Sequence, residues 1–299
     1  MQIVKSDKLY YEISRHNQPA ITIKPGETIK IETEDAFSGQ IRTNSDRRDR
    51  NTVPNSNPQS GPIFVEGADN GDTLVIDIVS ITPRIAQAAT HTTSSPGLVS
   101  EFLGTNPPHG TRICKIKDNK IWWNENLSIP YKPMIGTIGT APSIGVPTTV
   151  PAGPHGGNMD IKEVTEGNTV YLPVFVKGAL LHLGDAHAAQ GDGELCCTGF
   201  EMAASIIITV SLIKNTTIHR PRIRSPKEIM TVATGTPMER SIAQAYSDLI
   251  LWMEEEYKID RWDGWNLCTH VGAISVGYYA IGTVATKIET KYLSVAQNH

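Results

Sequence analysis

The chain has 299 residues, of which 39% are hydrophobic and 19% charged, a composition that excludes a disordered protein. A chain of this length buries about three-quarters of its unfolded surface, in one large domain or two closely packed ones. The formal net charge is −4 and the lysines and arginines are scattered, so we expect no nucleic-acid partner and no attachment to a membrane.

No leader sequence or membrane span is predicted. The N-terminal segment MQIVKSDKLYYEIS (1–14) alternates polar and apolar residues and lacks the apolar core of a signal peptide. The longest apolar run, ASIIITVSLI (204–213), is too short to cross a bilayer. The four cysteines include the adjacent pair Cys196 and Cys197 and show no zinc-type CxxC spacing. We therefore expect buried thiols without a disulfide framework, in a cytoplasmic protein.

Strand patterns dominate the first two-thirds of the chain. Three segments, GETIKIE (26–32), GDTLVIDI (71–78) and GNTVYLPV (167–174), join a glycine turn to alternating polar and apolar residues. The run 204–213 adds a buried strand, and frequent proline and glycine argue against long helices before residue 236. These patterns predict antiparallel sheets in a sandwich or jelly-roll-like arrangement.

The C-terminal part is predicted to be helical before it returns to a sheet. Thr236–Glu239 supplies an N-cap threonine, a proline at the first helical position and a capping-box glutamate. Asp260 can cap a second helix, so we expect helices at about 237–272. The alternation in AISVGYYAI (273–281) then predicts a strand. The expected class is mainly β, and α+β overall.

We expect two closely packed lobes, an N-terminal β lobe over 1–110 and a C-terminal β lobe over 111–299 that carries the site motifs. The N-terminal lobe contains a long, polar, proline-punctuated loop at 40–62 with four arginines. Long loops inside compact domains are usually functional or disordered. Two interpretations of the arginines stay open: a solvated loop, or the mouth of a site or a subunit contact.

Acidic and imidazole groups gather in LHLGDAHAAQGDGE (181–194), which contains no lysine or arginine. On a strand, Asp185 and His187 share one face, whereas His182 lies on the opposite face and is expected to be structural. Buried carboxylates are costly without a positive partner, which a divalent metal or a shared proton would supply. Aspartate with histidine suits zinc, and carboxylates with amide oxygens suit calcium. PHGGNMD (154–160) is a second such segment.

Other classes of protein remain open at this point. An acidic surface turn without any ligand is the simplest alternative. A calcium-stabilised β-sandwich module that binds carbohydrate would use the same acids and amides. A serine hydrolase is not indicated because no GxSxG motif occurs, and neither a P-loop nor a GxGxxG motif follows a strand.

Four blocks of the sequence resemble the acetamidase/formamidase family, over nearly the whole chain. The longest is GALLHLGDAHAAQGDGE (178–194), and GPIFVEGADNGDTLVIDI (61–78), PMIGTIGTAP (133–142) and GGNMDIKEV (156–164) occur in the family's order. The resemblance implies a mainly β enzyme that tends to form homodimers and hydrolyses formamide or acetamide to a carboxylate and ammonia. It also implies a divalent metal at or near the site, for which zinc and calcium are the candidates.

The resemblance and the acidic and imidazole groups together lead us to assign individual roles, with zinc as the first choice of cation. The expected metal ligands are Asp185, His187, Asp160 and Asp35. The expected group for proton transfer is Glu194, with His155 as second choice. The residues expected to bind the substrate amide are Gln190, Asn158 and Asp192.

Overall fold

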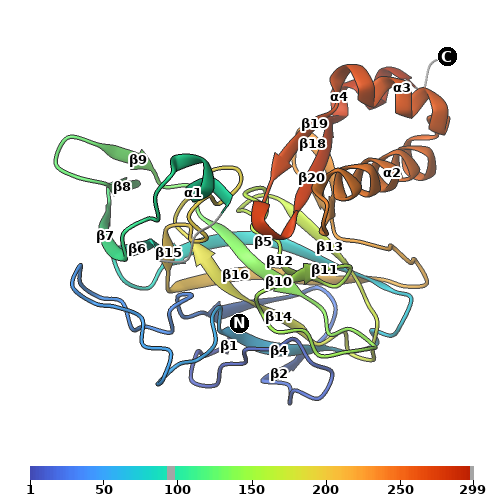
Figure 1. Ribbon diagram of the computed structural model, residues 1–299. Helices are drawn as coiled ribbons and strands as arrows, with labels where there is room; N and C mark the ends of the chain where they lie inside the picture. The colour runs from blue at the N-terminus through green and yellow to red at the C-terminus, as the bar shows by residue number, and fades with distance from the viewer. Residues whose placement is uncertain (93–97, 297–299) are drawn as a thin grey trace.

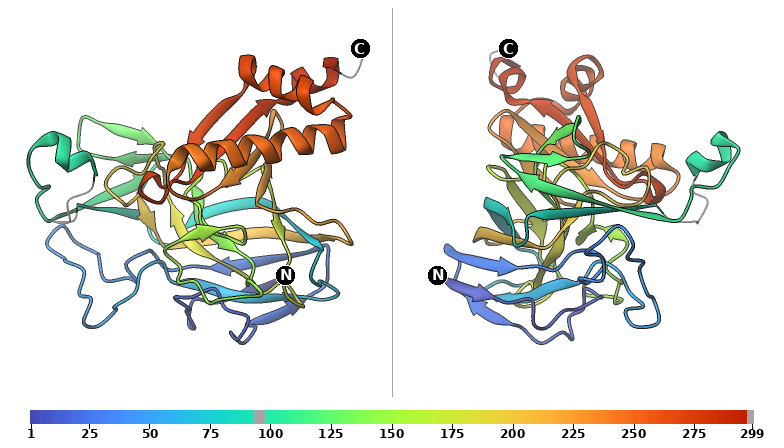
Figure 2. Two further views of the ribbon diagram at one scale, coloured as in Figure 1. Left: turned by 45° about the vertical axis from the view of Figure 1, so that its right-hand side comes forward. Right: turned by 90° about the vertical axis from the view of Figure 1, so that its left-hand side faces the viewer.

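The computed structural model describes residues 1–92 and 98–296 (Figure 1). Two large β-sheets form the body of the molecule, and helices gather beyond one end of them near the C-terminus (Figure 2). The predicted class, mainly β with a C-terminal helical segment, is confirmed.

The first sheet has nine strands and contains the segments with a glycine turn. Its order is β1 (Gln2–Val4), β3 (Glu27–Glu32), β16 (Ala204–Ile213), β5 (Thr73–Pro83), β13 (Thr169–Pro173), β17 (Arg222–Arg224), β18 (Glu228–Ala233), β20 (Val284–Glu289) and β19 (Ala273–Val276). The three segments with a glycine turn and the predicted buried strand are neighbours, as β3, β16, β5 and β13. Their pairings are antiparallel, as expected.

The second sheet has eleven strands and contains the acidic segment. Its main path is β11 (Ala152–Gly153), β12 (Gly156–Asn158), β10 (Met134–Gly139), β14 (Leu181–His187), β15 (Glu201–Met202), β6 (Gln87–Thr92), β7 (Gly110–Lys117), β8 (Lys120–Trp122) and β9 (Ser128–Pro130). Off this path, β4 (Gln59–Val65) pairs with β14 and with β2 (Ile21–Ile23). All residues of β14 are buried, because strands flank it on both sides.

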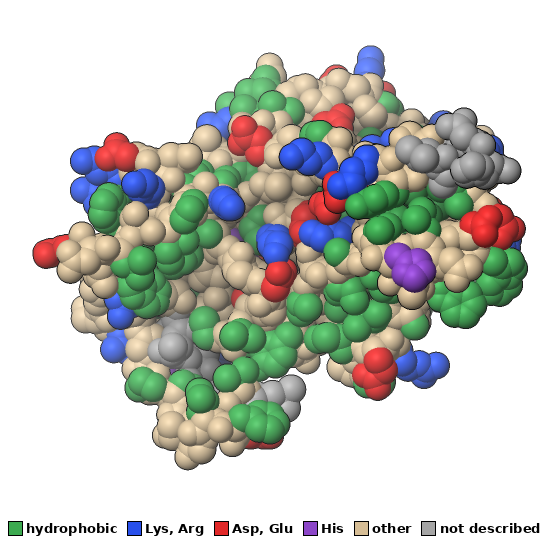
Figure 3. Space-filling view, turned by 90° about the horizontal axis from the view of Figure 1, so that it is seen from above, with side chains coloured by type: hydrophobic (Ala, Val, Ile, Leu, Met, Phe, Trp, Pro, Cys, Tyr) green, Lys and Arg blue, Asp and Glu red, His purple; other side chains and the backbone are tan. Residues whose placement is uncertain are grey.

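One hydrophobic core lies between the two sheets. It joins Ile76 and Ile206 of the nine-stranded sheet to Ile135 and Leu183 of the eleven-stranded sheet, all of them fully buried. Both sheets take strands from before and after residue 110, so the two predicted lobes interleave in each sheet. Side chains of both charges intermingle on the face seen from above (Figure 3).

The C-terminal helices pack over the end of the nine-stranded sheet. They are α2 (Met238–Tyr257), α3 (Arg261–Val271) and α4 (Thr290–Ala296), with a 3₁₀ turn at Tyr279–Ile281. The short helix α1 (Leu98–Leu103) lies apart from them, between β6 and β7 in the chain (Figure 1). Leu249 and Met253 of α2 are buried against Ile229 of β18 and Ile288 of β20. No helix among the described residues is long and apolar enough to span a membrane.

Three local predictions for this region have different outcomes. Asp260 caps α3, since its side chain accepts from the N–H groups of Trp262 and Asp263. The predicted capping box of α2 is wrong. The helix begins at Met238, so the cap position is occupied by Pro237, which has no side-chain acceptor. The strand predicted over 273–281 ends at Val276 and gives way to the 3₁₀ turn.

The four cysteines are free, as expected, but they are not all buried. Cys114 and Cys268 are buried, whereas Cys196 and Cys197 are exposed. The burial expected of the adjacent pair is wrong because both thiols lie in the turn between β14 and β15, outside the core.

His182 of β14 is a structural residue, as expected from its strand face. A carbonyl group can only accept, so Nδ1 donates to Leu180 O (2.9 Å) and Nε2 accepts from Asn17 Nδ2 (3.0 Å). Both contacts require a neutral imidazole. Burial lowers the pKa of His182 to about 4.

We therefore expect the stability of the protein to fall as the pH decreases from about 6.5 to 4. In this window the unfolded chain protonates His182 and the folded chain does not, so acid favours unfolding by up to about 3 kcal/mol. Urea unfolding at several pH values should show a shallower dependence for His182→Gln than for the original chain. Equal dependence on pH in both proteins would contradict the neutral assignment.

Candidate functional site

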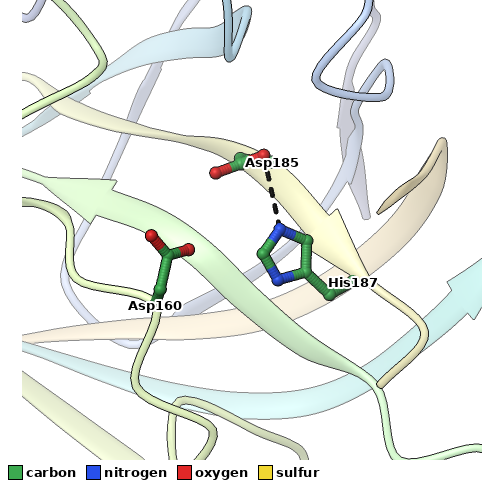
Figure 4. A group of neighbouring side chains, drawn as sticks. All are labelled: Asp160, Asp185 and His187. Carbon is green, nitrogen blue, oxygen red and sulfur yellow. Dashed lines mark ion pairs between the residues drawn. The ribbon is translucent and has the colours of Figure 1, made fainter. Parts of the chain in front are cut away.

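Five buried titratable residues converge at one end of β14. Asp185 and His187 point from the same face of that strand, and Asp160, which follows β12, faces them (Figure 4). Glu201 of β15 is the direct cross-strand partner of His187, and Glu194 comes from the turn between these two strands. The side chains are at most 8% exposed. We call Asp160, Asp185, His187, Glu194 and Glu201 the acid cluster.

The backbone of the acid cluster is strained to bring its side chains together. Asp160, Asp185 and Glu194 have φ angles of 51°, 57° and 47°, in the left-handed region that side chains disfavour. Each such residue costs about 1–2 kcal/mol. A Cβ atom on Gly136 of β10 would lie 2.5 Å from Asp160 Oδ1 and 2.9 Å from Asp185 Oδ2, so only glycine fits there. Strain of this kind is typical of functional sites.

Several polar atoms of the acid cluster are crowded together without a well-formed hydrogen bond. His187 Nε2 lies 3.2 Å from Glu201 Oε2 and 3.5 Å from Asp185 Oδ1. His187 Nε2, Glu201 Oε2 and both carboxylate oxygens of Asp160 are buried without a hydrogen-bond partner. Two triplets of possible ligand atoms, from Asp160, Asp185 and His187 and from His187, Glu194 and Glu201, each lie within 4.8 Å of one another. This arrangement is one that a cation would complete.

The electrostatics of the acid cluster reflect its excess of negative charge. Burial and then the charge of Asp185 raise the pKa of Asp160 to about 8, and burial raises the pKa of Glu201 to about 7. Burial and the charge of Asp160 raise the pKa of Glu194 well above its usual range. Burial opposes protonation of His187, but Glu201 and Asp185 outweigh it and raise the pKa of the imidazole. The carboxylates therefore need protons or a cation to be stable together.

Neutral side chains around the acid cluster hold its members in position. Asp185 Oδ2 accepts from Asn57 Nδ2 (3.0 Å) and from Thr137 Oγ1 (3.1 Å). The same two donors contact Asn158 Oδ1, at 3.1 and 2.6 Å. Asn57 and Thr137 thus turn the other oxygen of Asp185, Oδ1, toward His187.

Gln190 fixes the orientation of the His187 ring. Its Nε2 donates to the carbonyl oxygen of Asp160 (2.7 Å), which can only accept. Its Oε1 therefore faces His187 and accepts from Nδ1 (2.7 Å). Nε2 of His187 is left as the nitrogen that points into the acid cluster. Gln190 was expected to bind substrate; in the structure both ends of its amide are already bonded, to His187 and to Asp160.

A cavity of about 750 Å³ adjoins the acid cluster. Asp185, Glu194 and Glu201 contribute to its wall, together with Asn158. Arg48 and Arg50 of the long polar loop line the same cavity. Of the two interpretations of these arginines, the structure supports the mouth of a site.

Three residues expected in the site lie elsewhere. The carboxylate of Asp35 lies outside the acid cluster, where it is held by the N–H groups of Phe37 and Gly39 (both 3.0 Å) and by Arg42 Nη1 (2.6 Å). His155 lines a separate cavity beside Phe175. Asp192 has an exposed side chain that pairs with Lys162. His155 and Asp192 are close to members of the acid cluster in sequence, but the fold carries their side chains to other surroundings.

Sequence reasoning missed Glu201, Asn57 and Thr137. Glu201 stands alone between apolar residues in GFEMAAS (199–205). A lone acid in an apolar strand is the signal that could have identified it. Asn57 belongs to a polar loop and Thr137 to a glycine-rich strand, where such residues are common. Their roles depend on contacts with Asp185, which is distant in sequence.

Comparison with known proteins gives a consistent result. The sequence model of the acetamidase/formamidase family matches residues 12–148 and 145–255. The formamidase of Methylophilus methylotrophus is 30% identical over 249 residues, which cover 64% of this chain and 61% of that protein. The acetamidase of Mycolicibacterium smegmatis is 31% identical over 260 residues, which cover 65% and 63%. The chain thus spans less than two thirds of the length of these curated relatives.

The fold of this chain resembles solved structures over nearly all of its residues. A predicted acetamidase/formamidase from Thermoanaerobacter tengcongensis has a TM-score of 0.92 at 32% identity, covering 100% of this chain and 98% of that one. The acetamidase of Yersinia enterocolitica has a TM-score of 0.91 at 32% identity, covering 98% and 93%. A γ-lactamase from Delftia acidovorans, with a TM-score of 0.68 at 20% identity, shares the fold alone.

Proposed function

The chain belongs to the acetamidase/formamidase family, and from this premise we propose that it hydrolyses short aliphatic amides to a carboxylate and ammonia. The observation that carries the proposal is the buried acid cluster, of which Asp185, Glu194 and Glu201 line a cavity that can hold a small substrate. Amide hydrolysis needs an activated water and groups that move protons, and such residues are present there.

The acid cluster fits a divalent cation. The unpaired atoms of Asp160, His187 and Glu201, with Asp185 Oδ1 beside them, form a set of carboxylate oxygens and one imidazole nitrogen. This set favours zinc, because calcium binds oxygen ligands in greater number. Bound there, the cation would polarise the amide carbonyl and lower the pKa of water toward about 7.

Glu194 and Asn158 are the residues proposed to act on substrate and water. Glu194 lies in the wall of the cavity, and its raised pKa suits a group that takes a proton from the attacking water and gives it to the departing nitrogen. The Oδ1 atom of Asn158 is occupied by Thr137 and Asn57, which leaves its NH₂ group to donate to the substrate carbonyl. Burial around both residues strengthens these interactions.

Gln190→Leu should reduce turnover about 10- to 100-fold, as is typical when the residue behind a metal-binding histidine is lost. Without the Gln190 amide, His187 can rotate or change tautomer, so Nε2 no longer points into the acid cluster. The measurements are turnover of acetamide and the zinc content of the purified protein. Asp192→Asn, on the same turn but exposed, is the control and should retain both. Full turnover in Gln190→Leu would show that His187 needs no positioning.

The direct test of the proposed function is release of ammonia from formamide, acetamide and propionamide. The assay is run before and after EDTA treatment, with zinc or calcium added back. We expect release that EDTA abolishes and zinc restores. Release that survives complete removal of metal, checked by elemental analysis, would refute the role of the cation. Calcium-dependent binding of glycans without ammonia release would favour the carbohydrate-binding alternative.

A further inference from the structure

Two arginines in the wall of the cavity have no acidic partner. Arg48 is half-buried, and its guanidinium donates to Ser56 Oγ (2.6 Å) and to the carbonyl oxygen of Asn55. Its Nε is buried without a hydrogen-bond partner. Among the ion pairs of residues 1–92 and 98–296, none involves Arg48 or Arg50. Asp49, between them in sequence, also lines the cavity, but no carboxylate of the described residues forms an ion pair with either guanidinium.

The other arginines of the same loop differ in this respect. Arg42 pairs with Asp35 (2.6 Å) and with Glu34 (3.2 Å). Arg47 donates to the carbonyl oxygens of Asn44 and Asp46 and does not line the cavity. Arg48 instead has Arg50 as its charged neighbour, and burial and that neighbour together lower the pKa of Arg48. An anion close by would stabilise a half-buried cation that has a second cation beside it.

The cavity is also larger than a simple amide needs. Its volume is about 750 Å³, within the range of roughly 300–1,000 Å³ that accommodates drug-sized ligands. Formamide or acetamide would fill a small part of it. Residues of the acid cluster, which suits a cation and an amide, line this cavity. Two arginines, which suit an anion, line it as well. Arginine binds carboxylates through two parallel hydrogen bonds.

We propose that the preferred substrates are amides that carry a carboxylate at the other end of a short carbon chain. The amide group lies at the acid cluster, and Arg48, assisted by Arg50, binds the carboxylate. This inference rests on the proposed amide hydrolysis and names the substrate class for that site.

The test compares malonamate, succinamate and glutaramate with propionamide, butyramide and pentanamide, the neutral amides of equal carbon number. At the best chain length, kcat/KM should favour the anionic amide at least tenfold. Arg48→Gln should remove most of this preference, mainly through KM, as expected for loss of a charged hydrogen bond. Arg47→Gln, on the same loop outside the cavity, should leave the preference as it was.

Binding is measured separately, so that failure of the inference and of the proposed function can be told apart. Calorimetric titration with succinate needs no turnover, and we expect binding to the original chain and to Arg47→Gln but not to Arg48→Gln. Succinate binding that depends on Arg48, without hydrolysis of any amide, would sink the proposed function and leave an anion site. Hydrolysis of both amide series with equal kcat/KM would overturn the substrate assignment alone.

Two further outcomes are decisive. If Arg48→Gln does not fold, Arg50→Gln is the second variant. A fall of at least threefold in its preference for the anionic amide supports the inference, and no fall contradicts it. Inhibition by acetate that Arg48→Gln abolishes, without preference for an anionic amide, would make Arg48 a contact for the product. That result would also overturn the substrate assignment.

Discussion

Asp185→Asn should lose its bound cation and about 10³-fold or more of its amide turnover. Asp185 is 2% exposed, and its Oδ1 is aimed at the centre of the acid cluster by Asn57 and Thr137. An amide oxygen is a much weaker ligand than a carboxylate. The cation stabilises the transition state by several kcal/mol, and each loss of about 1.4 kcal/mol slows the reaction tenfold. Zinc content by elemental analysis and kcat for acetamide are the two measurements.

The stability of Asp185→Asn gives an independent check. In the presence of EDTA the variant should melt at a higher temperature than the original chain, because one of four mutually repelling carboxylates is gone. With zinc present the order should reverse, since only the original chain binds the cation tightly. Asp192→Asn is the matched control and should follow the original chain under both conditions. A variant with normal zinc content would show that Asp185 is not a ligand.

Glu194→Gln should reduce kcat about 10²- to 10⁴-fold, the usual contribution of a general acid–base group. Glutamine has the shape of glutamate but takes up no proton at neutral pH, so the attacking water is not activated. The zinc content should stay unchanged, which separates proton transfer from metal binding. Glu201→Gln, in contrast, should lose zinc, because Glu201 Oε2 faces His187 Nε2 at 3.2 Å. Loss of zinc from Glu194→Gln would reassign Glu194 as a ligand.

Local sequence patterns predicted the strands and the core of the site. The alternation in 181–187 places Asp185 and His187 on one face and His182 on the other, and β14 has this arrangement. Side chains in a strand alternate with a period of two whatever the strand pairs with. The central strands of the nine-stranded sheet were predictable for the same reason, as was the cap of α3 by Asp260.

Only the tertiary structure decided which distant residues meet. Glu201 joins the acid cluster because β15 pairs with β14 in a register that sets it opposite His187. Asp35 lies outside the acid cluster, because its carboxylate is already held by Arg42, only seven positions away, and by two backbone N–H groups. Arg48 lines the cavity because the path of its loop carries it there. Strand register and loop path depend on contacts across the whole chain, whereas hydrophobic periodicity is a property of neighbouring residues.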